Sequence, residues 1–218
     1  YGPIEVQVYG DFDRQKAIAT LQRTFGALAP RQPLPADTAP PTAEFPLPTI
    51  DPVLLTHRGD SNQAAAVISW PTGGGSKGIR TSRQIEILTQ IFTNRLMDAM
   101  REKMGASYAP QVYSTWPVDL DNGGSITALA QLDPQSVPTF FATADEIAAD
   151  LVANPPTPDE LARVTEPLRQ QVTRAATSSA FFMYQIEGAS QDPTRLASVR
   201  TLLADYTQTS PDSMQKLA

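Results

Sequence analysis

The sequence contains no cysteine and only one histidine, His57, among its 218 residues. The missing cysteines exclude disulfide bonds, thiolate metal sites and a cysteine nucleophile. One histidine cannot assemble a zinc site, which needs three or four ligands in a defined geometry, and it gives no basis for a Ser-His-Asp triad. We therefore interpret His57 as a surface or strand-end residue and expect this chain to bind no metal.

Basic residues are in the minority, and long apolar runs are missing. The chain has 17 Lys and Arg against 23 Asp and Glu, a formal net charge of -6 and a pI near 4.8. Because phosphate binding needs clustered basic side chains, nucleic acid is not an expected partner. No run approaches the roughly 18 apolar residues that span a bilayer, so we expect no membrane insertion.

The chain begins with Tyr1 and shows no signal-peptide pattern, so we interpret it as a fragment whose targeting sequence, if any, lies upstream. Its acidic, cysteine-free composition is typical of a bacterial periplasmic protein, and a cytoplasmic location stays open. The apolar fraction of 41% is sufficient for a buried core. We expect a single α+β domain over residues 1–218, with an extended connector over residues 30–48, which contain seven prolines.

Residue patterns predict strands at residues 4–9, 53–57, 64–70, 108–116 and 125–132. The turn Asp121-Asn122-Gly123-Gly124 joins the last two strands into an antiparallel hairpin. Pro110 has no backbone N–H, so its strand should lie at a sheet edge or a bulge. The glycines at residues 72–77 do not follow the order Gly-x-x-x-x-Gly-Lys-Ser/Thr of a phosphate loop, and we interpret them as a flexible surface turn.

Helices are predicted after Asp13 and from a capping box at Thr81 and Gln84 to a stop at Gly105. Four further starts pair a capping residue with a proline, at Asp133-Pro134, Thr157-Pro158, Asp192-Pro193 and Ser210-Pro211. The order of elements predicts an α+β fold in which helices pack on one face of a mainly antiparallel sheet.

The end of the longest predicted helix carries the most specific pattern. Arg101 stands in its last turn, and Tyr108 begins the next strand. A sharp turn from helix to sheet would let both side chains converge on one crevice. Each residue also has an ordinary structural interpretation, because a cation in the last turn of a helix contributes about 0.3–1 kcal/mol and tyrosine favours strands. Glu102 points about 100° around the helix from Arg101, and we interpret it as a solvated carboxylate.

The run Arg-Glu-Lys-Met-Gly-Ala-Ser-Tyr at residues 101–108 resembles the Arg...Tyr pair in the C-terminal half of zinc metallopeptidases of the pitrilysin/insulinase family. Residues 8–13, Val-Tyr-Gly-Asp-Phe-Asp, are similar to a strand end of the same family. The resemblance covers nearly the whole chain, although only residues 96–108 form a specific motif. The family's metal motif, His-x-x-Glu-His, cannot occur with one histidine. The resemblance therefore implies the zinc-free, substrate-binding C-terminal domain, with a metallohydrolase-like fold.

This resemblance implies roles for both residues. Arg101 would hold backbone carbonyls of a peptide substrate, and Tyr108 would donate its hydroxyl toward the scissile carbonyl oxygen. Zinc, its ligands and the carboxylate that activates water would come from an N-terminal zinc-binding domain or a partner subunit. The fragment alone should be inactive. The alternative is a non-catalytic homologue that binds peptides or scaffolds an assembly.

Overall fold

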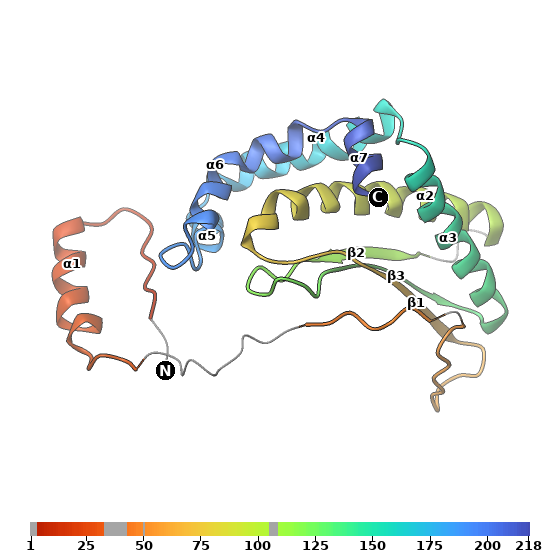
Figure 1. Ribbon diagram of the computed structural model, residues 1–218, viewed down its shortest axis with the longest axis horizontal. Helices are drawn as coiled ribbons and strands as arrows, with labels where there is room; N and C mark the ends of the chain where they lie inside the picture. Colours follow the sequence, from red (N-terminus) through yellow and green to blue (C-terminus); the bar gives the residue numbers. More distant parts are fainter. Residues whose placement is uncertain (1–3, 33–42, 50, 105–108) are drawn as a thin grey trace.

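The computed structural model describes residues 4–32, 43–49, 51–104 and 109–218. Its sheet has three antiparallel strands in the order β1-β3-β2, as Figure 1 shows. The strands are β1 (Ala64–Pro71), β2 (Gln111–Thr115) and β3 (Ser125–Leu132). The α-helices are α1 (Arg14–Arg23), α2 (Ile79–Met104), α3 (Val137–Ala153), α4 (Pro158–Ala175), α5 (Ser179–Gln185), α6 (Pro193–Thr207) and α7 (Pro211–Leu217). Short 3-10 turns are η1 (Phe25–Ala27), η2 (Ser76–Gly78) and η3 (Pro134–Ser136).

The two faces of the sheet differ in burial. In register, Ala128 of β3 stands opposite Ile68 of β1 and Val112 of β2, and this face is covered by helices. Successive side chains of a strand alternate between faces, so Val67 and Tyr113 lie on the other face, where they are exposed. The predicted hairpin is confirmed as the β2–β3 pair. Because β2 lies at an edge of this sheet, the edge position predicted for this strand is confirmed, although β2 begins at Gln111 and Pro110 precedes it instead of lying within it.

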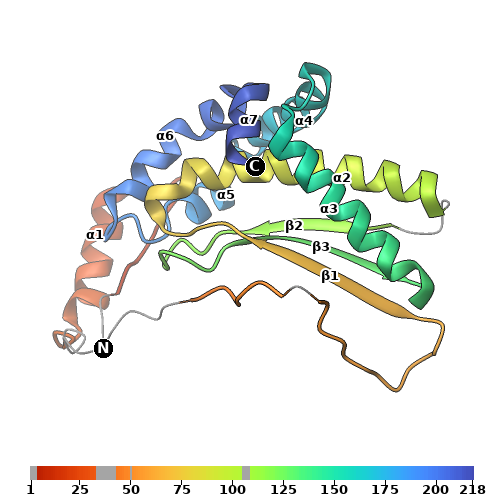
Figure 2. The same cartoon turned by 45° about the vertical axis from the view of Figure 1, so that its right-hand side comes forward.

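The helices form layers on one side of the sheet (Figures 1 and 2). The long helix α2 packs on β2, and α3 packs on β1, whereas α4, α6 and α7 lie against α2 on the side away from the sheet. The largest fully buried side chains of this core include Ile87, Ile91, Leu96, Met100 and Phe140. The predicted α+β class, with helices on one face of an antiparallel sheet, is confirmed.

Most of the predicted helix starts are present. The side chains of Thr157, Asp192 and Ser210 each accept a hydrogen bond from a backbone N–H in the first turn of α4, α6 and α7. Asp133 differs, because it precedes the 3-10 turn η3, and α3 begins only at Val137. Helix α2 begins at Ile79, so the capping box predicted at residues 81–84 lies within the helix.

Two predicted strands are wrong. Residues 4–9 are extended but unpaired with the sheet; instead, the Glu5 carboxylate accepts hydrogen bonds from the backbone N–H groups of Gly188 (2.6 Å) and Ser190 (3.1 Å). Residues 53–57 form no strand either, and the Leu54 side chain there is 87% exposed. Alternating apolar and polar side chains indicate which face of a strand would be buried. A strand forms a sheet only if a neighbouring strand also offers free backbone N–H and C=O groups.

The glycine-containing loop at residues 72–77 is held in place, which corrects its interpretation as a flexible surface turn. The Trp116 indole N–H donates to the Gly75 carbonyl (2.9 Å), and the Gly75 N–H donates to the Pro117 carbonyl (2.9 Å). A Cβ added to Gly73 in this loop would lie 2.9 Å from a ring carbon of Trp116, and one added to Gly78, directly after it, would lie 2.1 Å from another. The loop therefore requires glycine because the indole packs directly on its backbone.

Candidate functional site

Arg101 lies in the last turn of α2, with its side chain 58% exposed. Its Nη1 is 3.7 Å from Oδ1 of Asp98, whose side chain is 74% exposed. Such a solvent-exposed pair contributes at most about 1 kcal/mol, so a ligand can compete for this guanidinium. Tyr108 lies outside the described residues, and the convergence of the two side chains stays a prediction.

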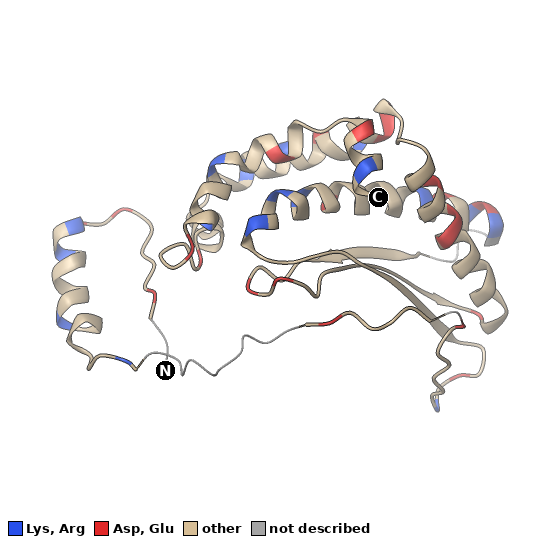
Figure 3. Ribbon diagram, in the orientation of Figure 1, with Lys and Arg blue, Asp and Glu red and all other residues tan. Residues whose placement is uncertain are grey.

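Arg101 lines a polar hollow of about 460 Å³ between α2 and α4. Figure 3 shows acidic and basic residues side by side at this end of α2. The polar side chains around the hollow are Asn94, Arg95, Asp98, Arg101, Glu160 and Arg163. Three arginines thus share one hollow with two carboxylates, and their partners decide which of them can bind a ligand.

Arg95 is committed to the fold. Its Nε and Nη2 donate to the two carboxylate oxygens of Glu160 at 2.8 and 3.2 Å, and its Nη1 donates to Asp150 at 2.7 Å. The hydrogen bond from Arg95, assisted by those from Thr157, lowers the pKa of Glu160 to about 2 despite its partial burial. The same bond raises the pKa of Arg95. This two-point pair fixes α4 on α2 and leaves little capacity on Arg95 for a ligand.

Arg163 resembles Arg101 in its environment. Its Nη2 donates to Oδ2 of Asp159 at 2.7 Å, one helical turn earlier, and both side chains are more than half exposed. Among the described residues, Arg101 and Arg163 therefore present two exposed guanidinium groups whose ion pairs are with exposed carboxylates of their own helices, and the Arg163 Nε also donates to the Asp159 carbonyl oxygen at 3.5 Å. Guanidinium donors in such a hollow suit carboxylates and backbone carbonyls. The sequence analysis did not identify Arg163, whose spacing from Asp159 indicates only an exposed helical ion pair.

The family of the peptidase M16 inactive domain matches residues 4–168, which is more than half of the chain. The chain belongs to the M16 peptidase family. A search of curated proteins finds no match. The recognition of an inactive domain of the pitrilysin/insulinase type is thereby confirmed.

Solved structures share the fold of this M16 inactive domain at low sequence identity. The periplasmic protease PqqL from Escherichia coli is 14% identical, with a TM-score of 0.71 over 95% of this chain and 22% of its own. A peptidase M16 inactive domain from Pseudomonas fluorescens is 19% identical, with a TM-score of 0.67 over 95% of this chain and 48% of its own. A predicted insulinase family protease from Yersinia pestis is 13% identical, with a TM-score of 0.61 over 94% of this chain and 46% of its own. The chain spans less than half of the length of each.

The residues of this M16 inactive domain that the structure describes do not fit a zinc site. In residues 4–32, 43–49, 51–104 and 109–218, no three His, Cys, Asp or Glu side chains form a group that could hold a metal ion. His57 closes a local turn, because its Nδ1 accepts from the Gly59 N–H (2.9 Å) and its Nε2 lies 3.1 Å from the Gln63 carbonyl oxygen. His57 and Glu102 are both exposed, as the sequence predicted for a surface histidine and a solvated carboxylate.

Proposed function

We propose that this M16 inactive domain is the substrate-binding domain of a zinc metalloendopeptidase and that Arg101 and Tyr108 act on the bound peptide. The family match over residues 4–168 supports the domain's place in such an enzyme. The exposed Arg101 guanidinium, whose one ion pair among the described residues is with Asp98 at 3.7 Å, is the observation that carries the role in binding. We also propose that residues 1–218 form one α+β domain with an extended connector at residues 30–48.

In this proposal the chain's residues bind and polarise the peptide. Arg101 donates its fork of N–H groups to backbone carbonyls, and Arg163, across the same hollow, provides a second guanidinium for a carboxylate or carbonyl. The Tyr108 hydroxyl donates to the scissile carbonyl oxygen as negative charge develops there, which contributes on the order of 3 kcal/mol to the transition state. The zinc belongs to an N-terminal zinc-binding domain or a partner subunit, because this chain's described residues do not fit it.

A periplasmic location is part of the proposal. The structural neighbour PqqL is described as a periplasmic protease, which supports this assignment. None of the helices that the structure describes has the length and hydropathy of a membrane span. Fractionation of cells that express the full-length protein tests the location, and recovery in the cytoplasmic fraction would contradict it.

Cleavage of a peptide by the full-length protein tests the function directly. We expect the full-length protein with zinc to hydrolyse an unstructured peptide, and the 218-residue chain alone to bind it without cleaving it. Binding by both forms with no cleavage by either would favour the non-catalytic homologue. Cleavage by the 218-residue chain alone would contradict the proposal that another domain or subunit holds the zinc.

A further inference from the structure

The carboxylate of Glu5 is held by backbone N–H groups from a distant part of the sequence. Its Oε2 accepts from the Gly188 N–H at 2.6 Å, and its Oε1 accepts from the Ser190 N–H at 3.1 Å. Both donors belong to residues 186–192 between α5 and α6, which we call the 186–192 turn. Figures 1 and 2 show the N-terminal segment beside this turn. Hydrogen bonds to an ionised group are roughly twice as strong as those between neutral groups.

The backbone of the 186–192 turn explains why these two N–H groups face the carboxylate. Gly188 has a φ of +75°, a conformation that favours glycine. The Ala189 N–H donates within the turn to the Ile186 carbonyl oxygen at 3.0 Å, and the Gln191 N–H donates to the Gly188 carbonyl oxygen at 3.1 Å. The N–H groups of Gly188 and Ser190 alternate with these two and donate to Glu5 instead. Backbone N–H groups that converge in this way form a concavity that binds anions.

The N-terminal segment contacts the turn and α5 with one of its two faces. Besides Glu5, the Gln7 Nε2 donates to the Ile186 carbonyl oxygen at 3.2 Å, and the Tyr9 ring stacks on Phe182 with the centroids 5.4 Å apart. The residues between them are exposed, as expected of an extended chain with a period of two. None of the α1 side chains that follow, all of which the structure describes, is buried. The contacts of residues 5, 7 and 9 therefore have a large share in positioning α1.

The other charged side chains near Glu5 come from the turn and from α6. A Cβ added to Gly188 would lie 2.8 Å from Nη1 of Arg195, and this Nη1 donates to the Glu187 carbonyl oxygen at 3.0 Å. Arg195 also forms ion pairs with Asp119, between β2 and β3, and with Asp192 at 3.9 Å. The guanidinium thus lies behind the N–H groups that hold Glu5, and its positive charge favours an ionised carboxylate there.

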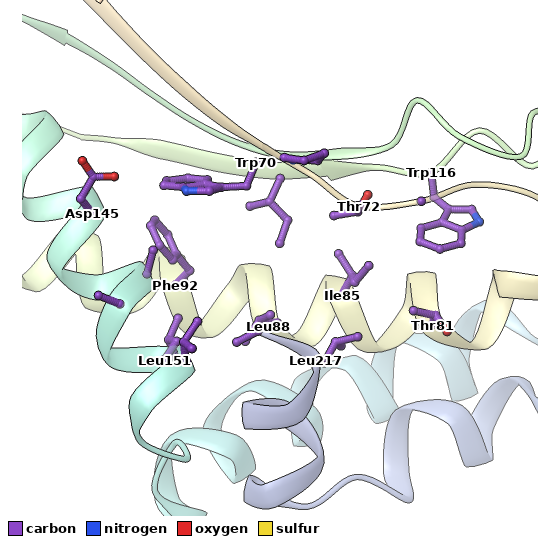
Figure 4. A pocket seen from close by; sticks show the side chains of 17 residues that line it. Trp70, Thr72, Thr81, Ile85, Leu88, Phe92, Trp116, Asp145, Leu151 and Leu217 are labelled. Carbon is purple, nitrogen blue, oxygen red and sulfur yellow. The ribbon is translucent and has the colours of Figure 1, made fainter. Parts of the chain in front are cut away.

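The turn also contacts the glycine-containing loop at residues 72–77. A hydrogen bond from the Ser76 side chain is the main cause that lowers the pKa of Asp192. The same loop is held by the indole of Trp116, which donates to the Gly75 carbonyl oxygen; Figure 4 shows Trp116 and Thr72 at this loop. A change at Glu5 is therefore made next to two further loops of the domain.

We propose that Glu5 is a carboxylate latch, whose ionised side chain holds residues 4–28 against the 186–192 turn and whose protonation in acid releases them. The Ser190 N–H, followed by the Ser190 side chain, lowers the pKa of Glu5 from its ordinary value of 4.5. The contribution of the latch is therefore complete above that ordinary value and is lost as the pH falls through the lower value of the folded chain. This inference does not depend on the roles proposed for Arg101 and Tyr108.

Amide hydrogen exchange of the 218-residue chain, followed by NMR, tests the latch at its two donors. Glu5→Gln keeps the size of the side chain and removes its charge, so exchange of the Gly188 and Ser190 N–H groups should accelerate at least about fivefold at neutral pH. The Ile186 N–H donates within α5 to the Phe182 carbonyl oxygen and should keep its rate. The matched control replaces the exposed Glu44 with glutamine and should change none of them. Unchanged exchange at Gly188 and Ser190, or equal acceleration at Ile186, overturns the inference.

The position of α1 is measured separately. Because the chain has no cysteine, Ala19→Cys on α1 and Ala197→Cys on α6, both exposed, introduce one pair of spin labels. The distance distribution should be narrow at about pH 7 and broad at about pH 3, and in Glu5→Gln it should be broad at both. Asp192→Asn removes the other carboxylate of the turn whose pKa is lowered and should keep the wild-type transition.

Three results of the distance measurement overturn the inference: a broad distribution in the wild type at neutral pH, a transition that persists in Glu5→Gln, or one that Asp192→Asn abolishes. Circular dichroism of the same samples shows whether the domain stays folded. If it unfolds before the latch titrates, the comparison of wild type and Glu5→Gln at neutral pH decides, and equal distributions there overturn the inference.

Discussion

The Arg83 guanidinium on α2 donates to the Asp205 carboxylate on α6 at 2.7 Å, and the two side chains are only 6% and 3% exposed. Arg83 also donates to the Ser198 carbonyl oxygen, and Asp205 also accepts from the Thr201 hydroxyl and lies 3.8 Å from Nε of the exposed Arg80. Nearby, the Tyr206 hydroxyl donates to Glu86 at 2.5 Å, and burial together with this carboxylate raises the pKa of Tyr206. This polar network fixes α6 on α2.

Replacing Arg83 with methionine should therefore destabilise the domain strongly. The change removes the buried, hydrogen-bonded cation of Asp205 and leaves that carboxylate only the exposed Arg80 guanidinium, 3.8 Å away, among the described residues. Removing one partner of a buried pair costs about 3–5 kcal/mol. Urea denaturation of the variant measures the loss. Arg169→Ala is the matched control, because its ion pair with Glu166 is exposed to solvent and should contribute much less to stability than the buried pair. Equal stability of the two variants would show that the buried pair does not hold α6.

Glu160 should make stability depend on pH in the acid range. Its pKa is lowered from 4.5 to about 2 in the folded chain, mainly by the Arg95 hydrogen bond. The unfolded chain therefore takes up the proton first, and this stabilising contribution is complete above about pH 5 and lost as pH falls toward 2.

Glu160→Gln should lower the free energy of unfolding at neutral pH by about 1–2 kcal/mol, after allowance for solvent screening of a partly exposed pair. The difference between variant and wild type should shrink as pH falls below 5. Urea titrations at several pH values measure it, with Glu102→Gln as the exposed control. A difference that stays constant down to pH 3 would contradict the assignment of the pair.

Gly78→Ala should displace the Trp116 indole, because the added Cβ would meet ring carbons of Trp116 at 2.1 and 3.0 Å. Overpacking of this kind costs about 1–3 kcal/mol. The emission spectrum and the melting temperature should both shift. In Gly26→Ala, the nearest atom to the new Cβ would be 3.4 Å away, so this control should behave like wild type. Unchanged emission in Gly78→Ala would mean that the indole does not rest on this backbone.

Local sequence signals predicted the helices well and the sheet less well. The capping side chains of Thr157, Asp192 and Ser210 act within a few residues of their own position, so the sequence around each is sufficient to place the helix start. The strand predicted at residues 4–9 failed because its interactions are made with Gly188 and Ser190, nearly the whole chain away. A local sequence pattern cannot identify a hydrogen-bond partner that lies so far away in the chain.

The same limit applies to the candidate sites. Arg101 was found from a family motif at the end of one helix, but Arg163 enters the same hollow only because α4 packs on α2. The Trp116 indole packs on Gly78, which lies 38 positions earlier in the chain. The sequence around the glycines could not show this contact and therefore indicated only a flexible turn.

Arg101 and Tyr108 should affect catalysis by the full-length protein rather than folding. Tyr108→Phe removes one hydroxyl, and if that hydroxyl meets the developing oxyanion, kcat should fall by about 10² to 10³ with a smaller change in KM. Arg101→Ala should raise KM as well, because the guanidinium also holds the ground-state peptide. Steady-state kinetics with a fluorogenic peptide and melting temperatures on the same samples measure both effects.

The pattern of changes across these variants distinguishes a functional role from a structural one. Among the described residues, Arg101→Ala removes one exposed ion pair, with Asp98 at 3.7 Å. The melting temperature of this variant should therefore match that of Arg169→Ala, which removes an exposed arginine from α4, away from the hollow. Arg169→Ala should also keep wild-type kinetics, whereas Arg163→Ala should raise KM if the peptide spans the hollow. A purely structural role would lower the melting temperature and leave the kinetics of the folded enzyme unchanged. Wild-type kinetics in both Arg101→Ala and Tyr108→Phe would show that neither residue belongs to the substrate site.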